Sequence, residues 1–150
     1  MVIKTIRLAT EKDAAELSRL NQEFNGGERV NPDMIRDSMR NNDEIIVVAT
    51  LNDRLVGFAC AQSVQSFCYA NGHGEITEMY VEENTRRMGL ASLMIALLEK
   101  KLVERGVTSI RILTGKRNNA AIHTYLCSDY NMEDEVVLEK KKLGMKELGI

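Results

Sequence analysis

The stretch Val81-Glu82-Glu83-Asn84-Thr85-Arg86-Arg87-Met88-Gly89-Leu90-Ala91 is the most informative part of the sequence, because it joins an expected strand to the longest expected helix. The strand is expected over residues 75–81 and the helix over residues 89–105. The small residues of Arg86-x-x-Gly89-x-Ala91 stand where the backbone must turn sharply and where a ligand can approach the main chain. The first amides of a helix lack internal partners and carry the positive end of its dipole, which suits a pyrophosphate. On this stretch alone, a glycine that merely eases the helix start is the simpler interpretation.

Upstream of this unit, the pattern predicts a strand, two helices and a hairpin. A strand is expected over residues 2–8, followed by a helix that Thr10 caps, with Asp13 in the capping-box position. Asn25-Gly26-Gly27 ends that helix, and Asn31-Pro32 begins the next one, with proline at its favoured first position. The β-branched run within residues 44–51 predicts a buried strand, and the chain turns at Asn52-Asp53 into a return strand over residues 55–61.

Downstream, shorter elements complete the order. Residues 63–74 are expected to form a loop, with a strand extension through Phe67 and Tyr69 as an alternative. A strand over residues 110–113, a helix capped by Asn118 and a last strand over residues 136–140 follow. The resulting order, β-α-α-β-β-β-α-β-α-β, predicts a mixed α/β (α+β) fold in which helices flank both faces of a central mixed sheet.

Composition narrows the possible classes of protein. The 150 residues suit one domain spanning 1–150, and no Pro-rich or Gly/Ser-rich linker divides them. The net charge of −2 gives no sign of a nucleic-acid partner, and the run 140–142 of three lysines is interpreted as a solvated strand end. The three cysteines, Cys60, Cys68 and Cys127, have no metal-ligand spacing and predict reduced thiols without a metal site. With no signal peptide and no membrane-spanning run, the sequence predicts a soluble cytoplasmic protein.

Two motifs at their mutual spacing resemble the GNAT superfamily of acyl-CoA-dependent N-acetyltransferases. Val81 followed by residues 86–91 is similar to the family signature Arg/Gln-x-x-Gly-x-Gly/Ala after a strand that ends in valine. Asn118-x-x-Ala121-x-x-x-Tyr125 is similar to its Asn-x-x-Ala-x-x-x-Tyr helix. The chain departs from the family where glycine is common at Arg87, and where Asp129-Tyr130 replaces the usual Gly-Phe. The order of strands and helices agrees over nearly the whole chain.

The resemblance implies acetyl-CoA as the acyl donor and a site for it. The amides of residues 87–91 would hold the pyrophosphate, with charge added at the rim by Arg86 and Arg87. The main chain of residues 79–81 would pair with the pantetheine arm like an added strand, and Asn118 would contact it. The implied donor-binding residues are therefore Met79, Tyr80, Val81, Arg86, Arg87, Met88, Gly89, Leu90, Ala91, Asn118 and Tyr125.

Acetyl transfer to an amine needs proton transfers that side chains can assist. An amine with a pKa near 10.4 is neutral only about one part in 10³ at pH 7, so a nearby carboxylate helps. Glu78 is the favoured base, because several amine-acetylating members of the family carry an acid there. Glu75 is the alternative and is expected to share the face of Met79, and use of no side-chain base is also open. Tyr125 is expected to protonate the departing thiolate, and the amide of Val81 or Tyr80 to polarise the thioester carbonyl.

The acceptor is expected to be the primary amine of a small molecule such as an aminoglycoside, a polyamine or an amino acid. Glu23, Glu28 and Asp33, near the expected entrance, would suit a cation. A peptide N-acetyltransferase and an acyl-CoA-binding sensor with little catalysis are alternatives. A nucleotide-binding loop fits poorly, because the Gly-Lys-Ser/Thr ending is missing. A homodimer is compatible with the sequence.

Overall fold

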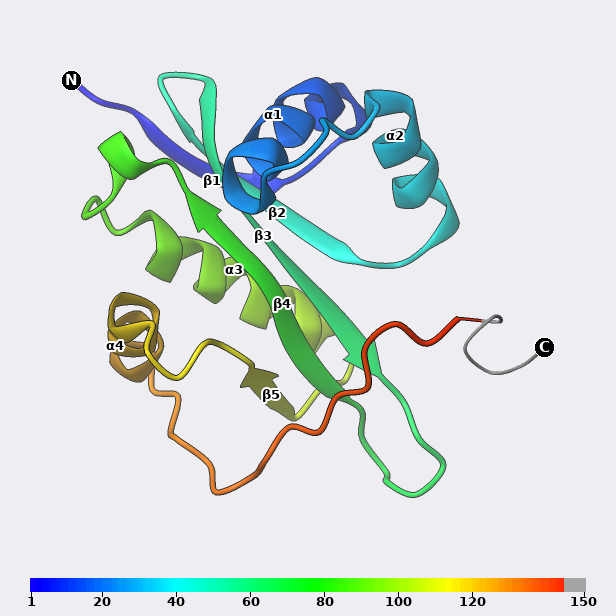
Figure 1. Ribbon diagram of the computed structural model, residues 1–150. Helices are drawn as coiled ribbons and strands as arrows, with labels where there is room; N and C mark the ends of the chain where they lie inside the picture. The colour runs from blue at the N-terminus through cyan, green and yellow to red at the C-terminus, as the bar shows by residue number, and fades with distance from the viewer. Residues whose placement is uncertain (145–150) are drawn as a thin grey trace.

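The computed structural model describes residues 1–144, and its centre is a five-stranded sheet with the order β1-β2-β3-β4-β5 (Figure 1). The strands β1 (Lys4–Leu8), β2 (Ile45–Leu51), β3 (Arg54–Val64) and β4 (His73–Val81) pair antiparallel in succession. The short strand β5 (Ser109–Ile112) pairs parallel to β4. The predicted mixed sheet is therefore confirmed, and within residues 1–144 its one parallel pair is β4 with β5 at the edge of the sheet.

Helices cover both faces of this sheet. The helices α1 (Ala14–Asn25) and α2 (Pro32–Asn41) lie over one face, where Leu17 and Leu20 pack with Val48 and Phe58. The helix α3 (Leu90–Glu104) lies on the other face, and its buried stripe of Leu90, Met94, Ile95, Leu98 and Leu102 meets the inner residues of β2, β3 and β4. The helix α4 (Asn119–Cys127) follows β5 (Figure 1). No helix within residues 1–144 is long and apolar enough to span a bilayer.

The helix starts and the hairpin form for the reasons expected from the sequence. The Asp13 carboxylate accepts a 2.8 Å hydrogen bond from the Thr10 amide and a 2.7 Å bond from Arg7, just before α1. The Asn31 side chain accepts from the Asp33 amide at 2.8 Å and caps α2. Asn52 and Asp53 have φ values of 49° and 69°, as a two-residue turn between right-twisted strands requires.

The strand β4 is paired unequally along its length. It contacts β3 from His73 to Val81, but it contacts β5 only from His73 to Ile76. A β-bulge interrupts its pairing with β3, since Ala61 lies opposite Ile76 while Cys60 lies opposite Glu78. The half of β4 after Ile76 therefore has a free edge, and this edge positions the candidate site.

The strand expected over residues 136–140 is not formed. These residues are coil, with Val136 84% exposed and Leu138 91% exposed. Their β-branched composition favours a strand, but an extended segment becomes a strand only when a neighbour pairs with its backbone. The loop expected over residues 63–74 is shorter than predicted, because β3 extends to Val64 and β4 begins at His73. The alternative extension through Phe67 and Tyr69 is wrong, since both residues lie outside the strands.

Candidate active site

The turn between β4 and α3 presents a row of unpaired amides. Gly89 caps the start of α3 with a φ of 78°, and Arg87 has a φ of 66°. Within the described chain, the amides of residues 87–92 donate no hydrogen bond, whereas Leu93 N already donates to Gly89 O at 3.1 Å. Consecutive free amides at the positive end of a helix of 15 residues form a site for an anion.

Side chains hold this turn from two sides. The Arg86 Nε donates to Val81 O at 2.9 Å, and its guanidinium carbon lies 5.9 Å from the centre of the Tyr80 ring. Lys4 Nζ donates to Met88 O at 3.0 Å. The Arg87 side chain is exposed and makes no ion pair with the described residues. Charge at the rim is therefore expected mainly from Arg87, while Arg86 attaches the turn to the end of β4.

The free edge of β4 exposes main-chain groups of alternate residues. Glu82 N donates to Val56 O in β3 at 2.8 Å. Alternate residues of an antiparallel strand direct their N–H and C=O groups to the same neighbour, so Tyr80 also faces β3, and Met79 and Val81 face the free edge. Because Val81 O accepts from Arg86, the groups left open are both main-chain groups of Met79 and the amide of Val81. Of the two amides expected near the thioester carbonyl, only that of Val81 faces the open edge.

A cavity of about 180 Å³ lies where β4 and β5 diverge. It brings together side chains from β4, α3 and α4 that are far apart in the sequence. Of the predicted site residues, Glu78, Met79, Ala91, Asn118 and Tyr125 line it. Phe24 of α1 and Thr77 of the bulge line it as well. Leu90 is instead buried in the core below the turn, so only its main chain can meet a ligand.

Tyr125 is one of the residues that line this cavity. Its side chain is half-buried, burial raises the pKa of its hydroxyl, and the hydroxyl has no hydrogen-bond partner in the part of the chain described. The end of α4 fixes its place: Tyr130 N donates to Tyr125 O at 3.0 Å, and Asp129 N donates to Leu126 O at 3.1 Å. This is a Schellman motif, with Asp129 at a φ of 68° in the position that glycine usually takes. The Tyr125 phenol is therefore protonated at neutral pH and open to a ligand.

The side-chain amide of Asn118 uses its oxygen in a hydrogen bond within the chain and leaves its nitrogen without a described acceptor. Its Oδ1 accepts a 3.2 Å hydrogen bond from Ala121 N and so caps α4. The expected contact with a ligand is left to the Nδ2 group, which donates to no described residue. One residue thus both starts α4 and lines the cavity.

The bulge changes the expected faces of the two candidate bases. Ile76 and Met79 both pack into the core on the α3 side, so strict alternation fails between them. Glu75, next to Ile76, consequently lies on the opposite face, the one that Glu78 and Tyr80 share. The expectation that Glu75 shares the face of Met79 is wrong, because a bulge adds one residue and cannot be read from this sequence. Both acids face the α1 and α2 side of the sheet.

Glu44 is a residue that the sequence analysis did not single out as part of the site. It precedes β2 by one residue and lies near Glu78, across the buried Cys60 of β3. Burial and the neighbouring charge of Glu78 raise the pKa of Glu44. Neither acid makes an ion pair with residues 1–144. The only sequence signal for this proximity is the pairing of three successive strands.

The acids expected at the acceptor entrance are mostly engaged. Glu23 accepts from Tyr80 Oη at 3.2 Å and from Arg19 at 3.1 Å, and Asp33 pairs with Arg36 at 2.7 Å. Glu28 is exposed. The acids on this side of the sheet that make no ion pair with residues 1–144 include Glu44, Glu75 and Glu78. No group of three or more His, Cys, Asp or Glu side chains within residues 1–144 could hold a metal ion.

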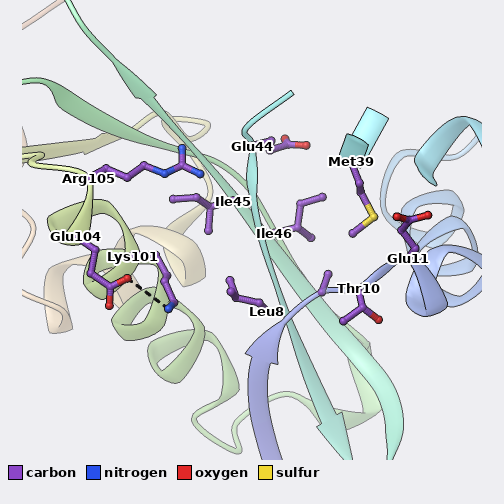
Figure 2. A pocket seen from close by; sticks show the side chains of 11 residues that line it. Leu8, Thr10, Glu11, Met39, Glu44, Ile45, Ile46, Lys101, Glu104 and Arg105 are labelled. Carbon is purple, nitrogen blue, oxygen red and sulfur yellow. Dashed lines mark hydrogen bonds and ion pairs between the residues drawn. The ribbon is translucent and has the colours of Figure 1, made fainter. Parts of the chain in front are cut away.

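A larger cavity of about 520 Å³ lies away from the predicted residues, at the start of β2 (Figure 2). Lys101 and Glu104 of α3 line one side together with Arg105, which follows the helix, and Met39 and Glu11 line the other. Its two cations are already paired, Lys101 with Glu104 at 3.4 Å and Arg105 with Asp43 at 4.0 Å. It contains no unpaired row of amides, so we place the candidate site at the smaller cavity beside α3.

Known proteins resemble this chain in sequence and in fold. The model of the family described as "Acetyltransferase (GNAT) family" matches residues 12–127. An acetyltransferase of Yersinia pestis is 31% identical over 111 residues, which cover 73% of this chain and 74% of that protein. One from Sodalis glossinidius is 30% identical over 113 residues, covering 75% of each.

Solved structures share the fold at low sequence identity. An aminoglycoside acetyltransferase from a soil metagenome, in complex with sisomicin, has a TM-score of 0.82 and 18% identity, with coverage of 94% of this chain and 97% of that one. Aminoglycoside N-acetyltransferase AAC(6')-Iy in complex with CoA has a TM-score of 0.81 and 15% identity, with coverage of 95% and 97%.

Proposed function

The chain belongs to the GNAT family of acetyltransferases, and from that premise we propose that it transfers the acetyl group of acetyl-CoA to a primary amine of a small molecule. Transfer would occur by direct attack in a ternary complex. The observation that carries the proposal is the row of free amides over residues 87–92 next to a cavity lined by Glu78, Asn118 and Tyr125. One end of this arrangement suits a pyrophosphate and the other supplies proton-transfer groups.

The donor would be held mainly by main-chain groups. The amides of Arg87, Met88, Gly89, Leu90 and Ala91 would bind its pyrophosphate, as their lack of partners supports. The open groups of Met79 and the amide of Val81 would pair with the pantetheine arm, as in β-strand addition. The Nδ2 group of Asn118 would add a side-chain contact.

The chemistry would divide between the two sides of the cavity. Acetyl-CoA supplies an activated acyl group as a thioester. Glu78 would take the proton of the acceptor ammonium, directly or through water, and Tyr125 would protonate the leaving sulfur. The Val81 amide would donate a hydrogen bond where negative charge develops on the carbonyl oxygen.

The acceptor would be cationic. Glu78 lines the cavity, Glu75 lies on the same face of the sheet and Glu44 lies close to Glu78, and grouped charge of one sign attracts a ligand of the opposite sign. Neighbours of the same fold include aminoglycoside acetyltransferases, which supports testing polyamino compounds first. Aminoglycosides, polyamines and amino-acid-like amines form the proposed class.

The test is release of the CoA thiol from acetyl-CoA in the presence of aminoglycosides, polyamines, amino acids and peptides, with mass spectrometry of the product. Turnover with a small amine, and a product heavier by one acetyl group, is the expected result. Turnover with peptides alone would replace the small-molecule acceptor by a polypeptide. Saturable acetyl-CoA binding without turnover of any amine would favour a sensor and contradict the enzymatic proposal.

A further inference from the structure

The half of β4 that has a free edge lacks one of the two neighbours that usually hold a strand in place. Thr77 to Val81 pair with β3 alone, yet their main-chain groups must keep a fixed direction to bind a ligand. Glu82 directly follows this half. Its amide donates to Val56 O at 2.8 Å, and its carbonyl oxygen accepts from the Thr85 amide at 3.0 Å and the Thr85 hydroxyl at 2.9 Å. Both main-chain groups of Glu82 are therefore engaged where β4 passes into the turn.

The side chain of Glu82 is a buried carboxylate between two arginines. It is 7% exposed, and Arg19 of α1 donates to its Oε1 at 2.5 Å. Arg54, at the start of β3, donates to both carboxylate oxygens, at 2.8 Å and 3.1 Å. Burial opposes ionisation, but these hydrogen bonds outweigh it and hold the pKa of Glu82 below its usual range. The charged carboxylate is thus fixed by α1 from one side and by β3 from the other.

Arg19 also reaches the side of the sheet where the acceptor is expected. The same Nη1 atom that donates to Glu82 donates to Glu23 at 3.1 Å, and Nη2 donates to Leu55 O at 2.9 Å. Glu23 accepts from the Tyr80 hydroxyl at 3.2 Å, and the Tyr80 ring stacks on the neighbouring side chain of α1 with ring centres 5.3 Å apart. One arginine therefore contacts the residue before the turn and the acid that holds Tyr80.

We propose that Arg19 is a positioning residue that keeps the free half of β4 and the turn over residues 87–92 in the conformation that binds the donor. It acts through Glu82 and supplies the restraint that a second strand neighbour supplies elsewhere in the sheet. Arginine suits this role because its planar guanidinium presents several donors in a fixed geometry. The inference rests on the proposed binding of acetyl-CoA at this turn, and it gives Arg19 no contact with either substrate.

Calorimetric titration of the full chain with CoA tests the proposal without an acceptor. Arg19→Met is expected to raise the Kd of CoA about tenfold, because the turn must then be ordered as the donor binds. Arg36→Met is the matched control. Arg36 likewise makes an ion pair within its helix, with Asp33 at 2.7 Å, and donates to a main-chain oxygen elsewhere, Glu11 O at 3.3 Å. Its interactions with residues 1–144 do not reach β4 or the turn, so its loss is expected to change the Kd less than about twofold.

Glu82→Ala breaks the same link from the other end. It leaves no buried cation unpaired, because Arg19 keeps Glu16 and Glu23 as partners and Arg54 is 58% exposed. This variant is expected to weaken CoA binding as much as Arg19→Met does. Glu82→Gln retains an oxygen that accepts a hydrogen bond, so its Kd is expected to stay within about threefold of that of the unaltered chain.

Hydrogen exchange separates positioning from overall stability. In Arg19→Met the amide of Glu82 is expected to exchange about tenfold faster, while residues 47–49 of β2, which pair on both sides, keep their rates. Uniformly faster exchange over the sheet would show a merely structural role and overturn the proposal. So would a Kd of CoA that neither Arg19→Met nor Glu82→Ala changes, and donor binding at the turn would then stand without it. No saturable binding of CoA to the unaltered chain would overturn both this inference and the proposed function.

Discussion

The two halves of β4 differ in what they pair with, and the difference separates stability from chemistry within one strand. From His73 to Ile76 the strand has a neighbour on each side, and Gly74 and Ile76 are buried. From Thr77 to Val81 it pairs with β3 alone, and its other edge opens on the cavity that Tyr125 and Asn118 line. Where pairing stops, main-chain groups become available to a ligand. The bulge at this boundary also turns Glu78 toward the α1 side of the sheet.

We expect the largest loss of activity when the proposed base, Glu78, is removed from the half of β4 that has a free edge (Thr77 to Val81). Glu78→Gln is expected to lower kcat about 10³-fold, which corresponds to about 4 kcal/mol of transition-state stabilisation. The matched control is Glu75→Gln in the paired half, an acid on the same face, which is expected to change kcat by less than about threefold. Steady-state kinetics with the best acceptor measure both. Equal losses of kcat in the two variants would contradict this, because they would mean that an acid on this face contributes to catalysis whether or not it lies beside the free edge.

Next in size is the effect of the phenol across the cavity. Tyr125→Phe is expected to lower kcat about 10²-fold while acetyl-CoA still binds, because only the proton donor is lost. Tyr130→Phe is the control, since Tyr130 stands 6.3 Å away ring to ring but donates its hydroxyl to Glu99 at 2.9 Å. It is expected to keep near-normal turnover. Unchanged turnover in Tyr125→Phe would remove Tyr125 from the mechanism.

A substitution in the half of β4 that pairs with both neighbours (His73 to Ile76) is expected to lower stability and to leave activity nearly unchanged. A Cβ at Gly74 would lie 2.8 Å from Leu102 Cδ1 of α3 and 3.3 Å from Val107 Cγ1. Gly74→Ala is therefore expected to lower the free energy of unfolding by about 1–3 kcal/mol through overpacking. Urea unfolding measures this loss, and kcat per folded molecule is expected to stay within about twofold of normal. A fall in kcat without a loss of stability would contradict the separation of the two halves.

The smallest expected effect concerns Glu44. Because its folded pKa is raised, the folded state binds its proton more tightly than the unfolded state does. Its contribution to stability is thus complete below the ordinary glutamate pKa and is lost as the pH rises through the raised value. Glu44→Gln removes this loss. At pH 7 the free energy of unfolding of the variant is therefore expected to exceed that of the unaltered chain by up to about 1 kcal/mol, a limit set by solvent screening of a half-exposed group. Urea unfolding at pH 4 and pH 7 measures it, and an equal difference at both values would contradict the cause.

Patterns local in the sequence predicted most of the fold. Capping residues such as Asn31, the turn at Asn52-Asp53 and the apolar stripe of α3 each act within a few residues, so the sequence shows them directly. The strand over residues 136–140 was predicted on β propensity, and the described chain offers it no partner. Strand formation depends on a neighbour that propensity does not identify.

The parts of the candidate site that are contiguous in the sequence could be predicted from it. The turn over residues 86–91 and the helix from Asn118 to Tyr125 carry their own spacing, and the cavity brings them together. The face of Glu75 was not predictable, because the bulge that sets it appears only in the pairing of β3 with β4. The proximity of Glu44 to Glu78 depends on three strands side by side, a relation between residues more than 30 positions apart.

Amide resonances observed by NMR while acetyl-CoA is added report whether the donor binds along the free edge of β4 and at the turn before α3. The amides of Met79, Val81 and residues 87–92 are expected to shift and to become protected from hydrogen exchange. Those of residues 73–76, which already pair on both sides, should change little. Saturable shifts confined to the larger cavity around Lys101 and Arg105, with residues 87–92 unaffected, would contradict donor binding at the turn.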